Sequence, residues 1–122
     1  MTKKATYIFT TYLNASHAIR WAEGTGQIHP HTYEIKYEFH LKKDQLVPFN
    51  KIENGLAAFL QKLNGKFLND EAPFDQINPT LENLTDYLCD ELAAQLTKLD
   101  CVLDEIAVSA SPTQAYHIRL TD

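Results

Sequence analysis

The amino-acid sequence predicts an α+β domain whose elements follow the order β-β-α-α-β-β. Three observations support this prediction. Apolar and polar residues alternate early in the chain, apolar residues recur every three or four positions in the middle, and short β-rich segments return at the end. Two hairpins flanking two helices fit a four-stranded antiparallel sheet with both helices on one face. At 122 residues, without repeats or low-complexity tracts, the chain is expected to form one domain over residues 1–122.

The first two expected strands form a hairpin. Residues 5–13 are rich in Thr, Tyr and Ile, which favour strands. Residues 31–41 alternate strictly, so that Tyr33 and its apolar neighbours share one face while Glu34 and its polar neighbours share the other. This pattern is typical of a half-buried antiparallel strand. The dense polar row on its second face favours contact with solvent or with another subunit.

The period then changes to that of a helix. An apolar stripe runs from Ile52 to Leu63, and Asn50 followed by Glu53 is a helix-start signature. Asn64-Gly65 is expected to end this first helix.

A second helix is expected from Thr80, as N-cap, to Leu99, after a polar loop over residues 69–79. The segments 101–111 and 114–122 are β-rich and are joined by a Ser-Pro-Thr turn. They supply the second hairpin.

Composition argues against several classes of function. The net charge is −5 and the basic residues are scattered, which argues against a nucleic-acid partner. No apolar run approaches the roughly 20 residues that span a bilayer, so no membrane partner is expected. Polar residues interrupt the segment after the basic N-terminus, unlike a signal peptide. Cys89 and Cys101 lie in apolar contexts without motif spacing and are expected to be reduced core residues of a cytoplasmic protein.

Three of the five histidines lie close together in the sequence. His29 and His31 are two residues apart at the start of the second expected strand, so they point to the same side. His17 lies at the end of the first strand, with eleven residues between it and His29, and a hairpin would place it opposite His29 and His31. Zinc binds three histidine nitrogens readily and leaves a fourth position open for water or substrate. The alternative is that all three are ordinary polar loop residues.

The segments NASHAI, HPHTYEI, LNGKFLND, PTLEN and SASPTQAY, in this order and spacing, resemble the 6-pyruvoyl-tetrahydropterin synthase family. This family includes 6-carboxytetrahydropterin synthase of the queuosine pathway. The resemblance covers nearly the whole chain and implies the T-fold (tunnelling fold), assembled into barrels of subunits that are commonly hexamers of two stacked trimers. It also implies that His17, His29 and His31 bind zinc, which holds the side-chain oxygens of dihydroneopterin triphosphate while the triphosphate is eliminated.

The resemblance fails at the positions of the catalytic residues. Thr25 stands where the family has a proton-abstracting cysteine, and its hydroxyl is a poor base. Asn64 and Gly65 replace an Asp-His pair that supports proton transfer, and Ala110 replaces the glutamate that anchors the pterin. Pro30 replaces the glycine that the family has between the two zinc-binding histidines, and it removes a backbone N–H donor and alters the wall of the pocket. A further possibility is that Pro30 abolishes zinc binding altogether.

Other residues are weaker candidates. A related subgroup uses glutamate in place of the cysteine, and Glu23 lies two residues before Thr25, which makes it a conceivable displaced base. Thr80 and Glu82 are explained as helix-start residues, although the resemblance places that segment near the pterin pocket. The remaining candidates, all interpreted as surface, structural or solvated residues, are Asp104, Glu105, His40 and His117.

Two functions follow from this pattern. The first is a zinc-dependent pterin lyase with altered chemistry, acting on a pterin-like ligand between the subunits of a trimer or hexamer. The alternative is a non-catalytic zinc-binding sensor or assembly subunit of the same fold. The missing base, relay and anchor favour the alternative, or a changed substrate under the first hypothesis.

Overall fold

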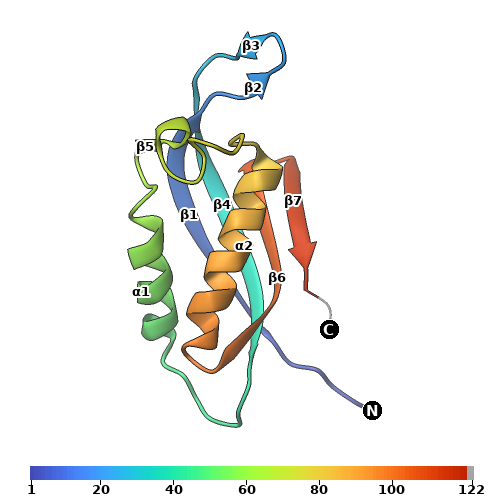
Figure 1. The fold of residues 1–122 in the computed structure, drawn as a ribbon. Helices are drawn as coiled ribbons and strands as arrows, with labels where there is room; N and C mark the ends of the chain where they lie inside the picture. The colour runs from blue at the N-terminus through green and yellow to red at the C-terminus, as the bar shows by residue number, and fades with distance from the viewer. Residues whose placement is uncertain (121–122) are drawn as a thin grey trace.

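A central sheet forms the body of the protein in the computed structural model, which describes residues 1–120 (Figure 1). Its strand order is β5-β1-β4-β6-β7. All neighbours are antiparallel except β5, which pairs with β1 in parallel at Ala15 and Ser16. The strands are β1 (Tyr7–His17), β4 (His29–Leu41), β5 (Lys66–Phe67), β6 (Cys101–Ser111) and β7 (Gln114–Arg119).

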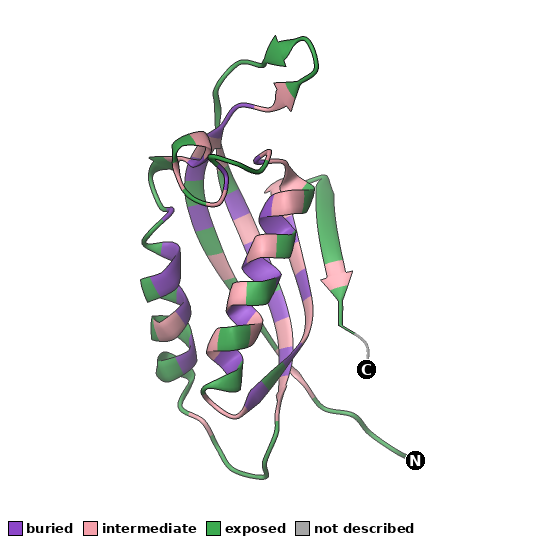
Figure 2. Ribbon diagram, in the orientation of Figure 1, coloured by how far each residue is buried: buried purple, intermediate pink, exposed green. Residues whose placement is uncertain are grey.

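Both helices, α1 (Phe49–Leu60) and α2 (Leu81–Thr97), lie on the same face of the sheet (Figure 1). The α+β fold class predicted from the sequence is therefore confirmed. Figure 2 shows the buried residues of the helices turned toward the sheet, where they form the core. The apolar row of β4 lies in this core, and Tyr33 and Phe39 are completely buried. The strict alternation of residues 31–41 therefore predicted correctly which face of β4 is buried.

The sheet has five strands rather than the four that the sequence predicts. The additional strand β5 contains two residues and follows α1 through a turn. A second small sheet, β2 (Arg20–Trp21) with β3 (Gly24–Thr25), forms within the connection between β1 and β4. Strands of two residues carry no alternation pattern, which is why sequence periodicity did not reveal them.

The first helix begins and ends earlier than predicted. Pro48 occupies the N-cap position without a side-chain hydrogen bond, so the helix-start interpretation of Asn50 is wrong. Pro48 has a φ of −59°, and its rigid ring sets the backbone direction just before the helix. The helix ends at Leu60 instead of Leu63, and the following turn closes at Gly65, whose φ is +76°.

The second helix begins as predicted. The Thr80 side-chain oxygen accepts a hydrogen bond from the Asn83 backbone N–H at 3.1 Å, so Thr80 is the N-cap. Glu82 lies in the first turn, where a carboxylate interacts favourably with the helix dipole. The helix ends at Thr97, two residues before the predicted Leu99.

Residues 69–79 are more structured than the predicted polar loop. The segment continues from a short 3-10 helix, η1 (Leu68–Asp70). Phe74 is completely buried and packs edge-on against Tyr87, with ring centroids 5.3 Å apart. One aromatic residue among polar neighbours gives no periodic signal, so its burial was missed.

Two further expectations can be compared with the structure. Cys89 and Cys101 are buried free cysteines, as expected. Among residues 1–120, neither helix is long and apolar enough to cross a membrane. The last two residues of the predicted strand 114–122 lie outside the described residues, and β7 ends at Arg119.

Candidate metal centre

The β1–β4 hairpin brings the three histidines together. His17 is the last residue of β1 and pairs directly with His29, the first residue of β4. His31 lies two residues further along β4, opposite Ala15. Because residues two apart on a strand point to the same side, His29 and His31 both face the His17 ring. The geometry predicted from the sequence spacing is found in the structure.

The distances between the ring nitrogens suit a metal ion. One candidate ligand nitrogen from each histidine can be chosen so that all three lie within 4.8 Å of one another. The Nε2 atoms of His17 and His31 are 3.1 Å apart. Two nitrogens bound to one tetrahedral zinc at about 2.0–2.1 Å would lie roughly 3.3–3.4 Å from each other. The His17–His31 pair is thus already close to the zinc spacing, and the three histidines together could hold a metal ion such as zinc.

The orientation of His17 is fixed by the loop before α2. Its Nδ1 lies 2.7 Å from the carbonyl oxygen of Pro79, which can only accept a hydrogen bond, so Nδ1 carries the proton. The lone pair of His17 is then on Nε2, the atom that faces His31. A hydrogen bond from the outer nitrogen of a histidine to a carbonyl is the usual support of a metal ligand. The hydroxyl oxygen of Tyr33 also lies 3.3 Å from His17 Nδ1.

Electrostatics keep two of these rings neutral. Burial lowers the pKa of His17, the Pro79 hydrogen bond opposes this shift, and positive charge on His31 or His29 lowers the pKa further. Burial also lowers the pKa of His31, aided by His29 and opposed by a hydrogen bond to the Ala110 backbone. Neutral imidazoles with converging lone pairs form an environment in which a metal cation is favourable.

The site is closed on one side and open on the other. His17 is only 6% exposed, His31 is partly buried and His29 is exposed. A metal held here would have its inner side fixed by the fold, while its outer side remains accessible to water or a small molecule.

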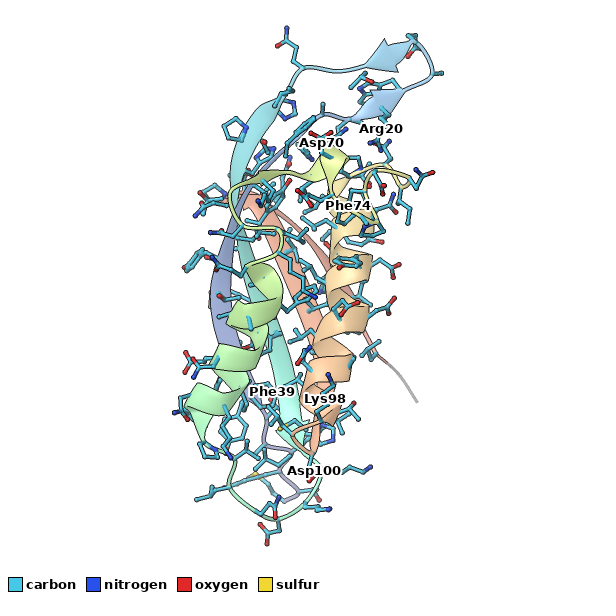
Figure 3. All side chains as sticks on the ribbon, turned by 60° about the vertical axis from the view of Figure 1, so that its left-hand side comes forward. Arg20, Phe39, Asp70, Phe74, Lys98 and Asp100 are labelled. Carbon is cyan, nitrogen blue, oxygen red and sulfur yellow. The ribbon has the colours of Figure 1, made fainter. Side chains whose placement is uncertain are left out.

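Two asparagine side chains hold the chain in place just after His17. Asn69 accepts from the Ala18 N–H at 2.9 Å and donates to the Ala18 carbonyl at 2.7 Å. Asn78 makes the same pair of hydrogen bonds with Arg20, both at 2.9 Å. Figure 3 shows Arg20, Asp70 and Phe74 gathered at this end of the molecule. Both amides were missed in the sequence, where asparagine beside a turn indicates only a loop.

Thr25 and Glu23 lie in a different setting from the histidines. Thr25 is exposed in β3 and pairs with Arg20, and Glu23 is exposed in the turn that precedes β3. Their small hairpin projects beyond the end of the main sheet (Figure 1). Neither residue belongs to the group of side chains that surrounds His17.

Asn64 and Gly65 lie beside β1. The Asn64 Oδ1 accepts a hydrogen bond from the Asn14 N–H at 3.0 Å, and the Gly65 N–H donates to the Asn14 carbonyl at 2.6 Å. Gly65 lines an open cavity of about 380 Å³ that is also lined by His31 and Lys66. The two residues attach the turn after α1 to β1 through these hydrogen bonds, and Gly65 brings that turn to the cavity that His31 also lines.

The remaining candidates divide by location. Thr80 directly follows Pro79, the residue that orients His17, so its capping role helps to fix the loop beside the three histidines. His40 and Asp104 form a pair with a 2.9 Å contact, and His117 and Glu105 form another at 2.7 Å. These four residues interact within the sheet and do not belong to the histidine group.

Zinc affinity is expected to decrease as the pH falls, because protons compete with the metal for the imidazole nitrogens. Because the pKa values of His17 and His31 are lowered from the ordinary 6.5, both rings reach half-protonation only below pH 6.5. The steepest loss of affinity is therefore expected below pH 6.5. Zinc titrations at a series of pH values measure this, and an affinity that stays constant down to about pH 5 would contradict it.

Comparisons with known proteins agree on one family. A family model described as 6-pyruvoyl tetrahydropterin synthase matches residues 6–120. The structure of the 6-pyruvoyl tetrahydropterin synthase of Caenorhabditis elegans has a TM-score of 0.79 at 16% identity, with 96% of both chains covered. That of Plasmodium falciparum has a TM-score of 0.65 at 16% identity, covering 96% of this chain and 100% of the other. No curated protein gives a match.

A third similar structure is a catalytic-residue mutant of the Plasmodium vivax 6-pyruvoyltetrahydropterin synthase, in which alanine replaces a glutamate. Its TM-score is 0.70 at 15% identity, covering 95% of this chain and 98% of the other. At such low identity these structural similarities establish the fold, while the family model identifies the family.

Proposed function

Because the chain belongs to the 6-pyruvoyl tetrahydropterin synthase family, we propose that it binds zinc through His17, His29 and His31 and holds a pterin-like small molecule at the metal. The observation that supports this most strongly is the convergence of three histidine nitrogens, one of them oriented by a backbone carbonyl. When bound, zinc supplies Lewis-acid chemistry that stabilises negative charge on ligand oxygens.

We further propose that the triphosphate-eliminating reaction of the family is altered or lost. At the positions where the resemblance expects a base and a proton relay, this chain has Thr25, Asn64 and Gly65. A threonine hydroxyl is a poor base at neutral pH. The Asn64 oxygen is already used as an acceptor for Asn14, and Gly65 has no side chain with which to carry a proton. A ligand would be bound here without an evident group to remove its proton.

Self-association into a trimer or hexamer is part of the proposal. The sheet face opposite the helices carries two large exposed apolar side chains, Ile8 and Tyr12, beside the polar row of β4. Within residues 1–120, β5 covers only the last part of β1, so the segment from Tyr7 to Asn14 is a sheet edge. Such edges pair readily with strands of another subunit.

A cytoplasmic location is also proposed. Cys89 and Cys101 are buried and free, and burial is the main cause that raises the pKa of each thiol. Thiols of this kind are unreactive and are compatible with a reducing compartment.

The proposal is tested by measuring neopterin binding through its fluorescence, with zinc present and after zinc is removed by a chelator. We expect saturable binding only with zinc, because the metal holds the ligand oxygens. If the zinc-loaded protein binds neopterin but does not convert dihydroneopterin triphosphate, this result would favour the sensor or assembly role over the lyase role. If the zinc-loaded protein does not bind neopterin at all, the proposed function is wrong.

A further inference from the structure

Another open cavity lies at the opposite end of the sheet from the three histidines. Its volume is about 450 Å³, within the usual range of small-molecule sites. It is lined by Lys4 from the segment before β1, by His40 of β4, and by Lys42, Lys43 and Asp44 from the turn after β4. His31 and His40 are nine positions apart on β4, or about 30 Å, so this cavity is distinct from the candidate metal centre.

A β-bulge pairs His40 with a carboxylate. The register of β4 and β6 shifts after Glu38, which leaves Asp104 as an extra residue in β6. The two carboxylate oxygens of Asp104 lie 3.0 and 2.9 Å from His40 Nδ1. The backbone carbonyl of Asp104 also accepts a hydrogen bond from the Leu120 N–H at 2.9 Å, which holds the bulge in place.

This pair fixes which nitrogen of His40 can bind a ligand. An ionised carboxylate can only accept a hydrogen bond, so Nδ1 carries a proton and donates it to Asp104. Nε2 is then the remaining ring nitrogen. It accepts from a P–O–H group when the ring is neutral and donates to a phosphate oxygen when the ring is charged. The His40 side chain is 36% exposed, so it is accessible from the cavity that it lines.

The turn that carries two of the lysines is attached to the turn between α2 and β6. The Lys42 N–H donates a hydrogen bond to the Asp100 carbonyl at 2.8 Å, and the Lys43 ammonium lies 3.8 Å from the Asp100 carboxylate. Figure 3 shows Asp100 at the end of the molecule away from Arg20. The backbone at Lys42 is therefore held in position.

The third lysine comes from the segment before β1. Two residues after Lys4, the Thr6 hydroxyl donates a hydrogen bond to the Glu38 carboxylate at 2.9 Å. This contact attaches the N-terminal segment to β4, the strand that also carries His40. Lys4 thus reaches the cavity from the opposite side to the turn after β4.

The lining of the cavity is positively charged in a chain whose net charge is −5. Asp44 is the one carboxylate that lines it, against three lysines, and Lys43 shares its charge with Asp100. Among residues 1–120, Lys4 and Lys42 form no ion pair. A local excess of positive charge of this kind attracts anions.

We propose that this cavity binds a phosphate group, held by the ammonium groups of Lys4 and Lys42 and by Nε2 of His40. A phosphate monoester carries about two negative charges at neutral pH and offers several acceptor oxygens, which suits two ammonium groups and an imidazole. The half-buried side chains of Tyr7 and Leu41 also line the cavity and give apolar surface to the organic part of such an ester. The site is independent of zinc binding.

The location of binding is tested by nuclear magnetic resonance of the ¹⁵N-labelled, zinc-loaded protein at low ionic strength. The probes are inorganic phosphate and adenosine monophosphate. Both are expected to shift the signals of the His40 ring and of the Lys42 and Lys43 amides. Stronger binding of adenosine monophosphate would identify the ligand as a phosphate ester, and binding of inorganic phosphate alone would identify it as the free ion; either result supports the site. If neither probe shifts these signals up to about 10 mM, the inference is wrong.

Two double variants separate a specific site from a general effect of charge. Lys4→Ala/Lys42→Ala removes two positive charges from the cavity. Lys51→Ala/Lys62→Ala removes the same charge from exposed positions in and just after α1, which are not among the residues that line the cavity. The first is expected to weaken phosphate binding by about tenfold and the control by less than about twofold. His40→Gln is also expected to weaken binding. If the first double variant or His40→Gln binds as tightly as the control, the inference is wrong.

Discussion

Replacing His29 by alanine is expected to lower zinc affinity by more than about 100-fold, because the substitution removes one of the three ligands. Loss of a hydrogen bond that only supports a ligand already lowers metal affinity by about 10- to 100-fold. His29 is exposed, so the substitution leaves no buried cavity and the fold is expected to be preserved. The measurement is a competitive zinc titration against a chromogenic chelator, with circular dichroism to confirm folding.

His117→Ala is the matched control for this variant. His117 is also an exposed histidine on a strand, but its partner is Glu105 rather than the histidine group. Its replacement is expected to leave zinc affinity unchanged. Equal affinities for His29→Ala, His117→Ala and the unmodified protein would show that zinc does not bind where the three rings converge.

The zinc-loaded protein is expected to release triphosphate from dihydroneopterin triphosphate very slowly. The lower end of ordinary enzyme rates is about 1 per second, and the expected rate is at least about 1,000-fold below it. The reason under this proposal is that the family position of the base is occupied by a residue that cannot readily accept a proton. Thr25 has a weakly acidic hydroxyl in an exposed hairpin, and no proton relay is available from Asn64 or Gly65. Triphosphate release is followed by chromatography over hours with protein at high concentration.

The metal content must be measured in the same sample, so that slow turnover is not confused with absence of zinc. A rate of about 1 per second or faster would contradict the proposed loss of chemistry, and would require another group to act as the base. Glu23 would then be the first residue to replace, because it lies in the turn that leads to Thr25.

The sequence predicted the parts of the fold that depend on long patterns. Alternation over residues 31–41 identified β4 and its buried face, and the position of Thr80 identified the start of α2. The start of α1 was not predicted correctly, because Asn50 carries a capping signature that the chain does not use after Pro48. The strand β5 was missed because its two residues are defined only by their pairing with β1.

The candidate site was predictable as far as residue spacing determines it. A histidine at the end of one strand and two at the start of the next must meet if the strands form a hairpin, and His17 does pair with His29. The support from Pro79 could not be predicted, because that residue is 62 positions away from His17. An open cavity is lined by Glu34 of β4 and Ala110 of β6. It likewise could not be predicted, because it depends on the pairing of β4 with β6, which local sequence patterns do not determine.

The central claim is that this chain retains a metal site although it lacks the catalytic residues of its family. Elemental analysis of the purified protein, after dialysis against zinc and removal of the excess, tests this most directly. We predict about one zinc per chain, as a single three-histidine site implies, and a loss of this zinc in the His17→Ala variant. No bound zinc, or the same zinc content in His17→Ala as in the unmodified protein, would contradict the claim.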